Sequence, residues 1–373
     1  MNLNHFVIFF LFLGMSCESD RDTSLSQGFV TSITDIDIEK HDKVLPEFEA
    51  LPTNNPINYI RDMLIVGDSL LVLNQLYQSD SNLLVINFLN SKNSLGNLVG
   101  IGDGPNSVTA VEGLASVSGR VQFYDPTSRK LHEIRNIHQL HSGNEHLETI
   151  STLPVMCRNA FVLDSTVICV PLDAGPVANS RFALYSKTGK LNTTYGEFPK
   201  RILPMDGRIH YDERMNNVAY EAVPTLLNDG TGFALAYKYK DRIEIYTMEG
   251  KLKKAIDGPD FFDPDFAQHE NHEGGLSIRS IPDVTNGAFI SVTSNSKVIL
   301  ALYSGMLDSP SNPDSNFRSY ATRKLFAFDW DGQLIGSYRL PFSSHAIAVS
   351  EDGTLFIASD DDDIKIYQSY VSF

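Results

Sequence analysis

A strand-and-turn unit that recurs along the chain constrains the fold more than any other feature of the sequence. In each copy an alternating apolar run ends in an aromatic residue, and a polar turn and a leucine follow. The aromatic residue and the leucine are six positions apart in Tyr185–Leu191, Tyr246–Leu252 and Phe328–Leu334. Glycine in these turns supplies the positive φ that a tight hairpin needs. The aromatic residues of all copies are Phe88, Tyr124, Tyr185, Tyr246, Phe328 and Tyr367.

A second hairpin of the same kind precedes most units, for example over residues 63–73 and 347–357. Two hairpins in succession predict the four-stranded antiparallel blade of a β-propeller. Six aromatic landmarks therefore predict an all-β fold, a six-bladed β-propeller over residues 29–373 as a single domain. The last blade has sequence for three strands only, so we expect a segment within residues 29–60 to add the fourth and close the ring.

The first sixteen residues carry no Asp, Glu, Lys or Arg and contain an unbroken apolar run of eight, Phe6–Leu13. This run is too short to span a bilayer and is typical of a secretory signal. Residues 13–17 resemble the lipobox of bacterial lipoproteins, although Gly14 stands where leucine is usual. We expect a signal peptide over 1–16, lipidation of Cys17 and a flexible acidic tether over 17–28. An ordinary signal peptide with an incidental cysteine is the alternative.

The charge balance excludes several classes of partner. Lys and Arg total 30 and Asp and Glu total 46, so the net charge is −16. Nucleic acids and anionic lipid surfaces bind basic proteins, so we expect contact with a membrane through the lipid anchor alone. The acidic residues 18–22 resemble an export signal of surface lipoproteins, and a solvated tether would also be acidic. We expect a monomeric protein of the outer membrane, periplasmic or surface-exposed.

Two cysteines remain in the mature chain, Cys157 and Cys169, and they flank a predicted hairpin. A turn at Asp164 and Ser165 sets Cys169 opposite Ala160, a register that disfavours a disulfide. An exported protein can form one, so the pairing stays open.

Three features of the sequence resemble those of a known family. These are the predicted anchor, the first hairpin with Gly67–Leu70 and the glycine loop Gly100–Asn106. In these features the chain resembles the TolB-like six-bladed propeller lipoproteins of Bacteroidetes. The likeness covers about residues 17–373, and family members commonly have Glu where Asn106 stands. The resemblance implies a propeller fold and an envelope location, but no particular chemistry.

The loops predict which face binds. Turns between strands 1 and 2 and between strands 3 and 4 lie on one face, here called the short-turn face. The other connections lie on the opposite, long-loop face, and they include residues 100–106, 199–217, 258–283 and 304–323. Loops of this length commonly carry function, so we predict binding at the long-loop face.

Candidate ligand-binding residues fall in these loops. His269 and His272 alternate with Glu270 and Glu273, which are residue types that bind zinc. A solvated polar loop explains the same residues, and we predict no metal and no cofactor. A second set of candidates consists of Arg, His and Tyr residues in two other long loops. Such side chains suit stacking and forked hydrogen bonds to a ligand, although they also pack at loop bases. This set comprises Arg208, His210, Tyr211, Arg318 and Tyr320.

No sequence motif presents a catalytic nucleophile, since a Gly-x-Ser-x-Gly elbow is missing. We therefore expect a binding module for a protein, peptide or saccharide, with no catalytic residue assigned. The alternative is a propeller enzyme, a metal-dependent hydrolase or lyase with its site at the mouth of the central funnel.

Overall fold

The computed structural model describes residues 30–51, 57, 59–74, 82–87, 94–101, 107–134, 147–172, 177, 179–198, 216–227, 229–270, 276–281, 284–307, 321–359, 361 and 363–372. For residues 82–87, 94–98, 100–101, 107, 267–270 and 276–280 it describes the backbone alone.

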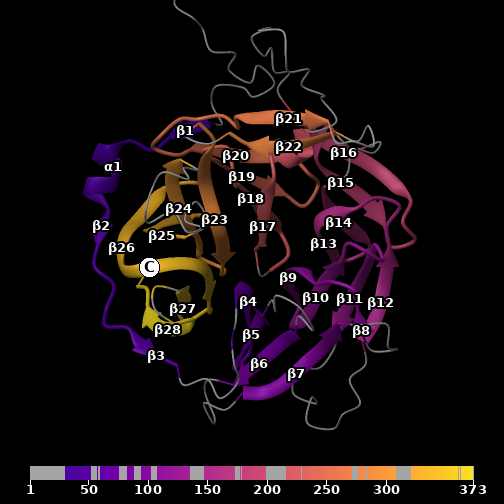
Figure 1. Ribbon diagram of the computed structural model, residues 1–373, viewed down its shortest axis with the longest axis horizontal. Helices are drawn as coiled ribbons and strands as arrows, with labels where there is room; N and C mark the ends of the chain where they lie inside the picture. The colour runs from indigo at the N-terminus through magenta and orange to yellow at the C-terminus, as the bar shows by residue number, and fades with distance from the viewer. Residues whose placement is uncertain are drawn as a thin grey trace, which may run out of the picture.

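Antiparallel sheets surround a central channel, as the sequence predicted (Figure 1). From the channel to the rim, blade 1 comprises β4 (Ile60–Val66), β5 (Ser69–Asn74), β6 (Asn82–Asn87) and β7 (Ser94–Ile101). Blade 2 comprises β9 (Glu112–Val117), β10 (Arg120–Asp125), β11 (Lys130–Ile134) and β12 (Leu147–Thr152). Blade 3 comprises β13 (Cys157–Leu163), β14 (Thr166–Pro171), β15 (Ser180–Ser186) and β16 (Leu191–Glu197). Blade 4 comprises β17 (Ala222–Leu226), β18 (Gly232–Tyr237), β19 (Arg242–Thr247) and β20 (Leu252–Asp257). Blade 5 comprises β23 (Asn286–Ser294), β24 (Val298–Leu307), β25 (Thr322–Asp329) and the first half of the long strand β26 (Leu334–Val349). Blade 6 comprises the second half of β26, β27 (Thr354–Ser359), β28 (Lys365–Tyr370) and β3 (Glu49–Ala50).

Shorter elements lie in the connections between these blades. Strand β8 (Ser107–Val108) pairs in parallel with β7, and helix α2 (Asn216–Ala219) precedes blade 4. The hairpin of β21 (Phe266–Glu270) and β22 (Leu276–Ser280) lies between blades 4 and 5.

The recurring sequence unit has one structural basis in blades 3 to 5. The aromatic residue and the leucine form a cross-strand pair between strands 3 and 4, as in Tyr246 and Leu252. A register shift immediately before the aromatic residue recurs in all three blades. Phe88 lies outside the described residues.

Blade 2 departs from the predicted order. Tyr124 lies in its second strand and pairs with Leu131 in its third, so the tight turn joins strands 2 and 3. The sequence unit specifies a hairpin but not its place in a blade, and our assignment of Tyr124 to a third strand was wrong. The longer connection of blade 2, residues 135–146, consequently joins its third and fourth strands.

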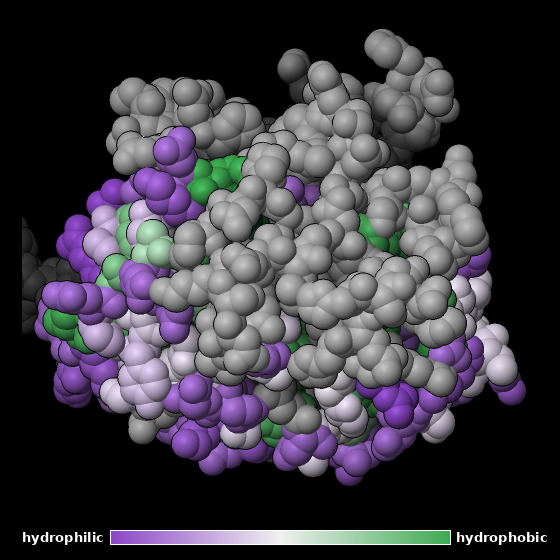
Figure 2. Space-filling view, turned by 90° about the horizontal axis from the view of Figure 1, so that it is seen from below, coloured by the Kyte–Doolittle hydropathy of each residue, from purple (hydrophilic) through white to green (hydrophobic). Residues whose placement is uncertain are grey.

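The core consists of apolar clusters, one at each junction between neighbouring blades. Because alternate residues of a strand point to opposite faces, each blade contributes to two of these clusters. Every residue of β5 and β18 is buried, whereas most residues of the rim strand β16 are exposed. Seen from the side of blade 1, the coloured part of the surface is mainly hydrophilic (Figure 2).

An N-terminal belt, residues 30–51, follows the rims of three consecutive blades. Strand β1 (Val30–Ser32) pairs in parallel with β20, and β2 (Asp42–Lys43) pairs in parallel with β26. Helix α1 (Asp35–Lys40) joins them and begins with a capping box between Thr34 and Asp37. Strand β3 pairs with β28 and completes blade 6, which confirms the predicted closure (Figure 1). The two contacts on blades 4 and 5 were not predicted.

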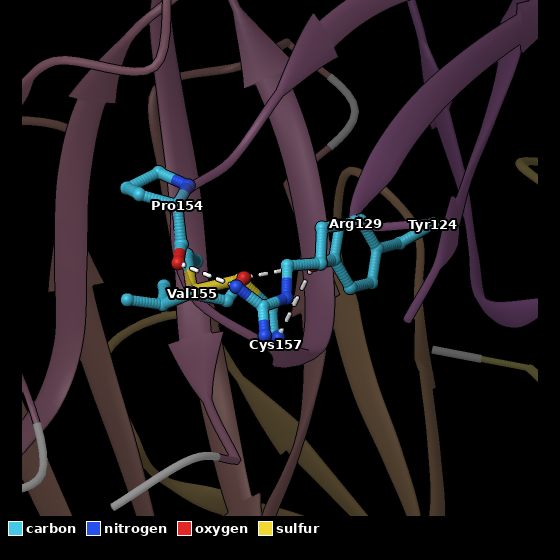
Figure 3. The surroundings of a disulfide bond; sticks show 6 residues. Tyr124, Arg129, Pro154, Val155 and Cys157 are labelled. Carbon is cyan, nitrogen blue, oxygen red and sulfur yellow. Dashed lines mark hydrogen bonds between the residues drawn. A yellow bond between two sulfur atoms is a disulfide. The ribbon is translucent and has the colours of Figure 1, made fainter. Parts of the chain in front are cut away.

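Cys157 and Cys169 form a disulfide in blade 3, with their Cα atoms 5.7 Å apart. Cys169 does pair with Ala160, yet our inference that this register disfavours the bond was wrong. A β-bulge between Cys157 and Asn159 breaks the regular ladder and brings Cys157 within reach. Beside it, Tyr124 from blade 2 donates a hydrogen bond to Val155 O at 3.0 Å (Figure 3). Arg129 likewise donates to Pro154 O at 3.0 Å.

A buried carboxylate holds the loop that leaves blade 4 on the long-loop face. The Asp241 carboxylate accepts hydrogen bonds from Asp260 N at 2.7 Å and from Phe261 N at 2.8 Å. Tyr303 OH donates to Asp260 Oδ2 at 2.7 Å. Burial raises the pKa of Asp241 to about 6, although the two N–H donors oppose the rise. These bonds hold Phe261 at φ +51° with 59% of its surface exposed.

We predict that Leu51→Ala lowers the free energy of unfolding by about 2 kcal/mol, because Leu51 is 8% exposed and packs where blades 6 and 1 meet. Val44→Ala is the matched control, since Val44 belongs to the same belt and is 95% exposed. Chemical denaturation measures both. Equal stability of the two variants would show that the belt does not contribute to ring closure.

We also predict a pH dependence that Asp241→Asn removes. The pKa of Asp241 is about 6 in the folded protein against 3.8 for an unperturbed aspartate side chain, so the folded state retains the proton between these values. Stability contributed by this group is therefore present at low pH and declines as the pH rises from about 4 to about 6. The asparagine oxygen can accept the same two N–H donors without ionising.

Between pH 4.5 and pH 7 the original protein should lose on the order of 2 kcal/mol of unfolding free energy relative to Asp241→Asn. Denaturation at both pH values measures it. Asp331→Asn is the control, because Asp331 is 76% exposed and its pKa is lowered rather than raised. Parallel pH profiles for Asp241→Asn and the original protein would contradict the burial of an ionisable Asp241.

Candidate functional site

Most of the predicted ligand-binding residues lie outside the described part of the chain. This applies to Arg208, His210, Tyr211, His272, Arg318 and Tyr320, and the predicted lipidation site Cys17 also lies outside it. For His269 the backbone alone is described, and it belongs to β21 opposite Ser277. The long connection over residues 258–283 therefore includes a hairpin.

A cavity of about 280 Å³ occupies the channel and is lined by the innermost strand of every blade. These strands are β4, β9, β13, β17, β23 and the second half of β26, and the labels of the first five lie around the centre of Figure 1. Each innermost strand begins on the long-loop face, because the preceding connection comes from the neighbouring blade. Side chains at the strand starts therefore lie at the long-loop end of the channel, which we call the channel mouth.

Five charged side chains of alternating sign follow the channel mouth through blades 1 to 4. Glu112 forms ion pairs with Arg61 and, at 3.8 Å, with Arg158. Arg158 and Lys238 both pair with the same oxygen of Glu221, Oε1. The series Arg61, Glu112, Arg158, Glu221, Lys238 thus holds three cations and two carboxylates.

These charges shift one another's titration. Burial acts to raise the pKa of Glu221, but Lys238 and Arg158 hold it below its usual value. Burial also acts to lower the pKa of Arg158, and Glu221 and Glu112 hold it above its usual value. Burial lowers the pKa of Lys238 in spite of Glu221. The ion pairs therefore keep Glu221 and Arg158 charged at neutral pH.

A recurring backbone irregularity brings these side chains to the channel. The register shifts at Arg61 in β4, at Gly113 in β9, at Arg158 in β13 and at His345 in β26. Strand β23 shifts twice, around Phe289. A β-bulge redirects side chains that strict alternation would turn away, and here consecutive residues such as Arg158 and Asn159 both line the cavity.

Close packing accompanies the bulge in blade 2. Gly113 has φ +57°, and a side chain there would collide with the Asn159 side chain of blade 3. Glycine at this position therefore permits Asn159 to lie at the channel wall.

The wall on the side of blades 5 and 6 mixes apolar, aromatic and hydroxyl side chains. From β23, Ile290 and Val292 line the cavity together with Ser291, Thr293 and Ser294. Tyr59 and His345 stack there with ring centroids 5.3 Å apart and an interplanar angle of 11°. The charged series thus faces a wall whose described lining residues include no Asp, Glu, Lys or Arg.

Asp62 lies beside the charged series with both oxygens engaged by the backbone. It accepts hydrogen bonds from Met63 N at 2.8 Å and from Leu114 N at 3.0 Å. Burial raises the pKa of Asp62 to about 6, and these donors oppose the rise. Asp62 therefore joins blades 1 and 2 rather than pairing with the cations of the mouth.

A second buried ionic network stabilises blade 4 away from the channel. Glu244 is fully buried and accepts hydrogen bonds from Tyr237 OH and Tyr246 OH, both at 2.6 Å. It also pairs with Arg181 from blade 3 and, at 3.7 Å, with Arg242. A buried carboxylate needs such partners, so this cluster is structural.

The described residues contain no group of three or more His, Cys, Asp or Glu side chains placed to hold a metal ion. The same part of the chain has no helix of the length and apolar character that a membrane crossing needs.

The sequence offered one signal for the channel mouth that we did not use. Charged residues stand at or next to the start of inner strands whose remaining residues are largely apolar, as Arg61, Glu112, Arg158 and Glu221 do. Only the ring geometry shows that these four positions converge.

Comparison with known proteins agrees with this architecture. No curated protein matches the chain. A Bacteroides fragilis protein designated as exported has a TM-score of 0.54 and 11% identity, with 92% of this chain and 99% of that chain covered. A streptogramin B lyase has a TM-score of 0.46 and 13% identity over 87% and 98% of the two chains. Virginiamycin B lyase from Staphylococcus aureus has a TM-score of 0.44 and 14% identity over 87% and 99%.

At 11% identity the Bacteroides fragilis structure shows a likeness of fold alone. The family comparison is more specific, because the model of the TolB-like 6-blade propeller-like family matches residues 61–352, which is most of the propeller. The chain therefore belongs to the TolB-like 6-blade propeller-like family.

Proposed function

We propose that the protein is a lipid-anchored binding module of the bacterial cell envelope, of the Bacteroidetes lipoprotein type, which binds a protein partner through its long-loop face. The apolar composition of that face carries the proposal. Among the described residues, Phe261, Val284, Met306 and Leu307 are exposed large apolar side chains in or beside connections of that face.

These side chains belong to one region of the long-loop face, around blade 5. Asn286 pairs with Leu307 and Gly287 with Met306, two to three residues after Val284. Gly305 lies against the Asp260 carboxylate, so the Phe261 loop adjoins the end of β24. Exposed apolar residues that gather in this way are typical of protein interaction sites.

The ligand-binding residues predicted in the long loops are proposed to extend the same surface. Residues 199–215 leave blade 3 at its rim strand and enter blade 4, and residues 308–320 connect β24 to β25. Both connections belong to the long-loop face by their place in the blades. Arg208, His210, Tyr211, Arg318 and Tyr320 are therefore proposed to contact the partner.

Lipidation of Cys17 is proposed to hold the protein at the outer membrane. The belt begins at Val30, so about a dozen residues separate the proposed anchor from the propeller. A chain of this length reaches about 40 Å when extended, which is sufficient for a tether.

Metabolic labelling with an alkyne fatty acid tests the anchor. We expect the protein expressed in a bacterial host to take up the label and to sediment with membranes, and Cys17→Ala to lose both properties. Ser19→Ala is the control and should retain them. Label on Cys17→Ala, or an unlabelled original protein, would overturn the anchor.

Site-specific photo-crosslinking in intact cells tests the binding surface. A photoreactive phenylalanine analogue replaces Phe261 or Leu307 on the long-loop face, or Leu191, which is 40% exposed at the short-turn face, as the control. We expect a discrete crosslinked product from positions 261 and 307 and none from 191. No product from the long-loop positions, or equal products from all three, would contradict the proposed surface.

A further inference from the structure

The channel mouth has more hydrogen-bond donors than its own acceptors use. Each guanidinium and each ammonium group carries several N–H donors, whereas only Glu112 and Glu221 receive them in the charged series. Asp62 does not compete for these donors, because its oxygens accept backbone N–H groups. A ligand at this position must therefore supply acceptors.

Two buried polar atoms at the mouth have no hydrogen-bond partner among the described residues. They are Arg158 Nε, a donor, and Asn159 Oδ1, an acceptor. Both residues line the cavity, and Asn159 is 6% exposed. Because an unpaired buried polar group costs free energy, its retention beside a cavity points to a bound ligand.

The arrangement of donors suits a carboxylate. The three cations of the described channel mouth face the two carboxylates of the charged series and Asp62, whose oxygens accept backbone N–H groups. A planar carboxylate matches the fork of a guanidinium such as that of Arg158, and further donors are present at Arg61 and Lys238.

The opposite wall and the volume limit what else the ligand contains. Ile290 lies half-buried across from the charged series, with the stacked rings of Tyr59 and His345, whereas Phe289 is 1% exposed and belongs to the core. Such a wall desolvates an apolar or aromatic group. The volume of about 280 Å³ is at the low end of small-molecule sites, so the group must be small.

We infer that the channel mouth binds a small organic carboxylate that bears an apolar group, with the carboxylate held by the cations Arg61, Arg158 and Lys238 and the apolar group against Ile290. This inference deepens the proposed function, since it names the chemistry that the centre of the long-loop face recognises. The carboxylate belongs either to a free acid or to the C-terminus of a peptide whose last residue is apolar.

Isothermal titration of the purified protein with matched probes tests the inference. The probes are N-acetylphenylalanine and its amide, the peptide acetyl-Gly-Gly-Phe as acid and as amide, and inorganic phosphate. We expect at least one acid to bind, with its amide at least tenfold weaker and phosphate weaker than the acid. Binding of the peptide acid identifies a C-terminus as the source, and binding of N-acetylphenylalanine alone identifies a free acid; both support the inference.

Variants locate the binding site. Arg158→Gln would leave the buried Glu221 with one cation fewer and could prevent folding. The main variant is therefore Arg61→Gln, because the Arg61 side chain is 31% exposed. We expect Arg61→Gln to weaken the acid about threefold or more and to leave the amide unchanged. Arg323→Gln is the control, because Arg323 is 54% exposed and pairs with Asp361 away from the channel.

Three results would overturn the inference: no binding of either acid at millimolar concentration, equal affinity of acid and amide, or phosphate binding as tightly as the acids. An unchanged acid affinity in Arg61→Gln would also overturn the location. None of these results bears on the crosslinks from Phe261 and Leu307, which lie outside the channel lining. Failure of this inference is therefore distinguishable from failure of the proposed function.

Discussion

Burial of both faces of every blade against its two neighbours is the interaction on which the remaining structure depends. Each junction holds one apolar cluster, and a blade taken from the ring would expose two of them. The blades therefore stabilise one another around the whole ring, and the ring needs β3 to complete the final blade. Apolar burial on this scale also offsets the cost of placing charged groups such as Glu244 in the interior.

The same arrangement explains why the charged series lies at the channel. The inner edges of the blades are the places where strands from different blades approach one another without a continuous apolar layer. Bulges at Arg61, Arg158 and His345 turn those side chains into this space, and neighbouring blades supply the opposite charges. The position of the site and the closure of the ring are thus consequences of one geometry.

The sequence contains enough information to predict the propeller, because the aromatic-turn-leucine unit encodes a hairpin locally and its repetition encodes the blades. It was less informative where the backbone departs from regular alternation. The bulge at Arg158 reverses the expectation for the disulfide and also redirects a charged side chain, and neither effect is visible in residue spacing. The charged series was missed for a related reason. Arg61 and Lys238 are 177 positions apart (238 − 61), and they share one site only because the ring brings blades 1 and 4 to a common centre.

The belt gives the propeller a mechanical property. A pull on Val30 along the strand axis loads the β1–β20 pairing in shear, so that several hydrogen bonds resist together. Behind that pairing, β2 and β3 attach the same segment to two further blades through separate pairings. Tension that enters from the N-terminal side is therefore carried by pairings on blades 4 and 5 before it reaches β3–β28, the strand pair that closes the ring.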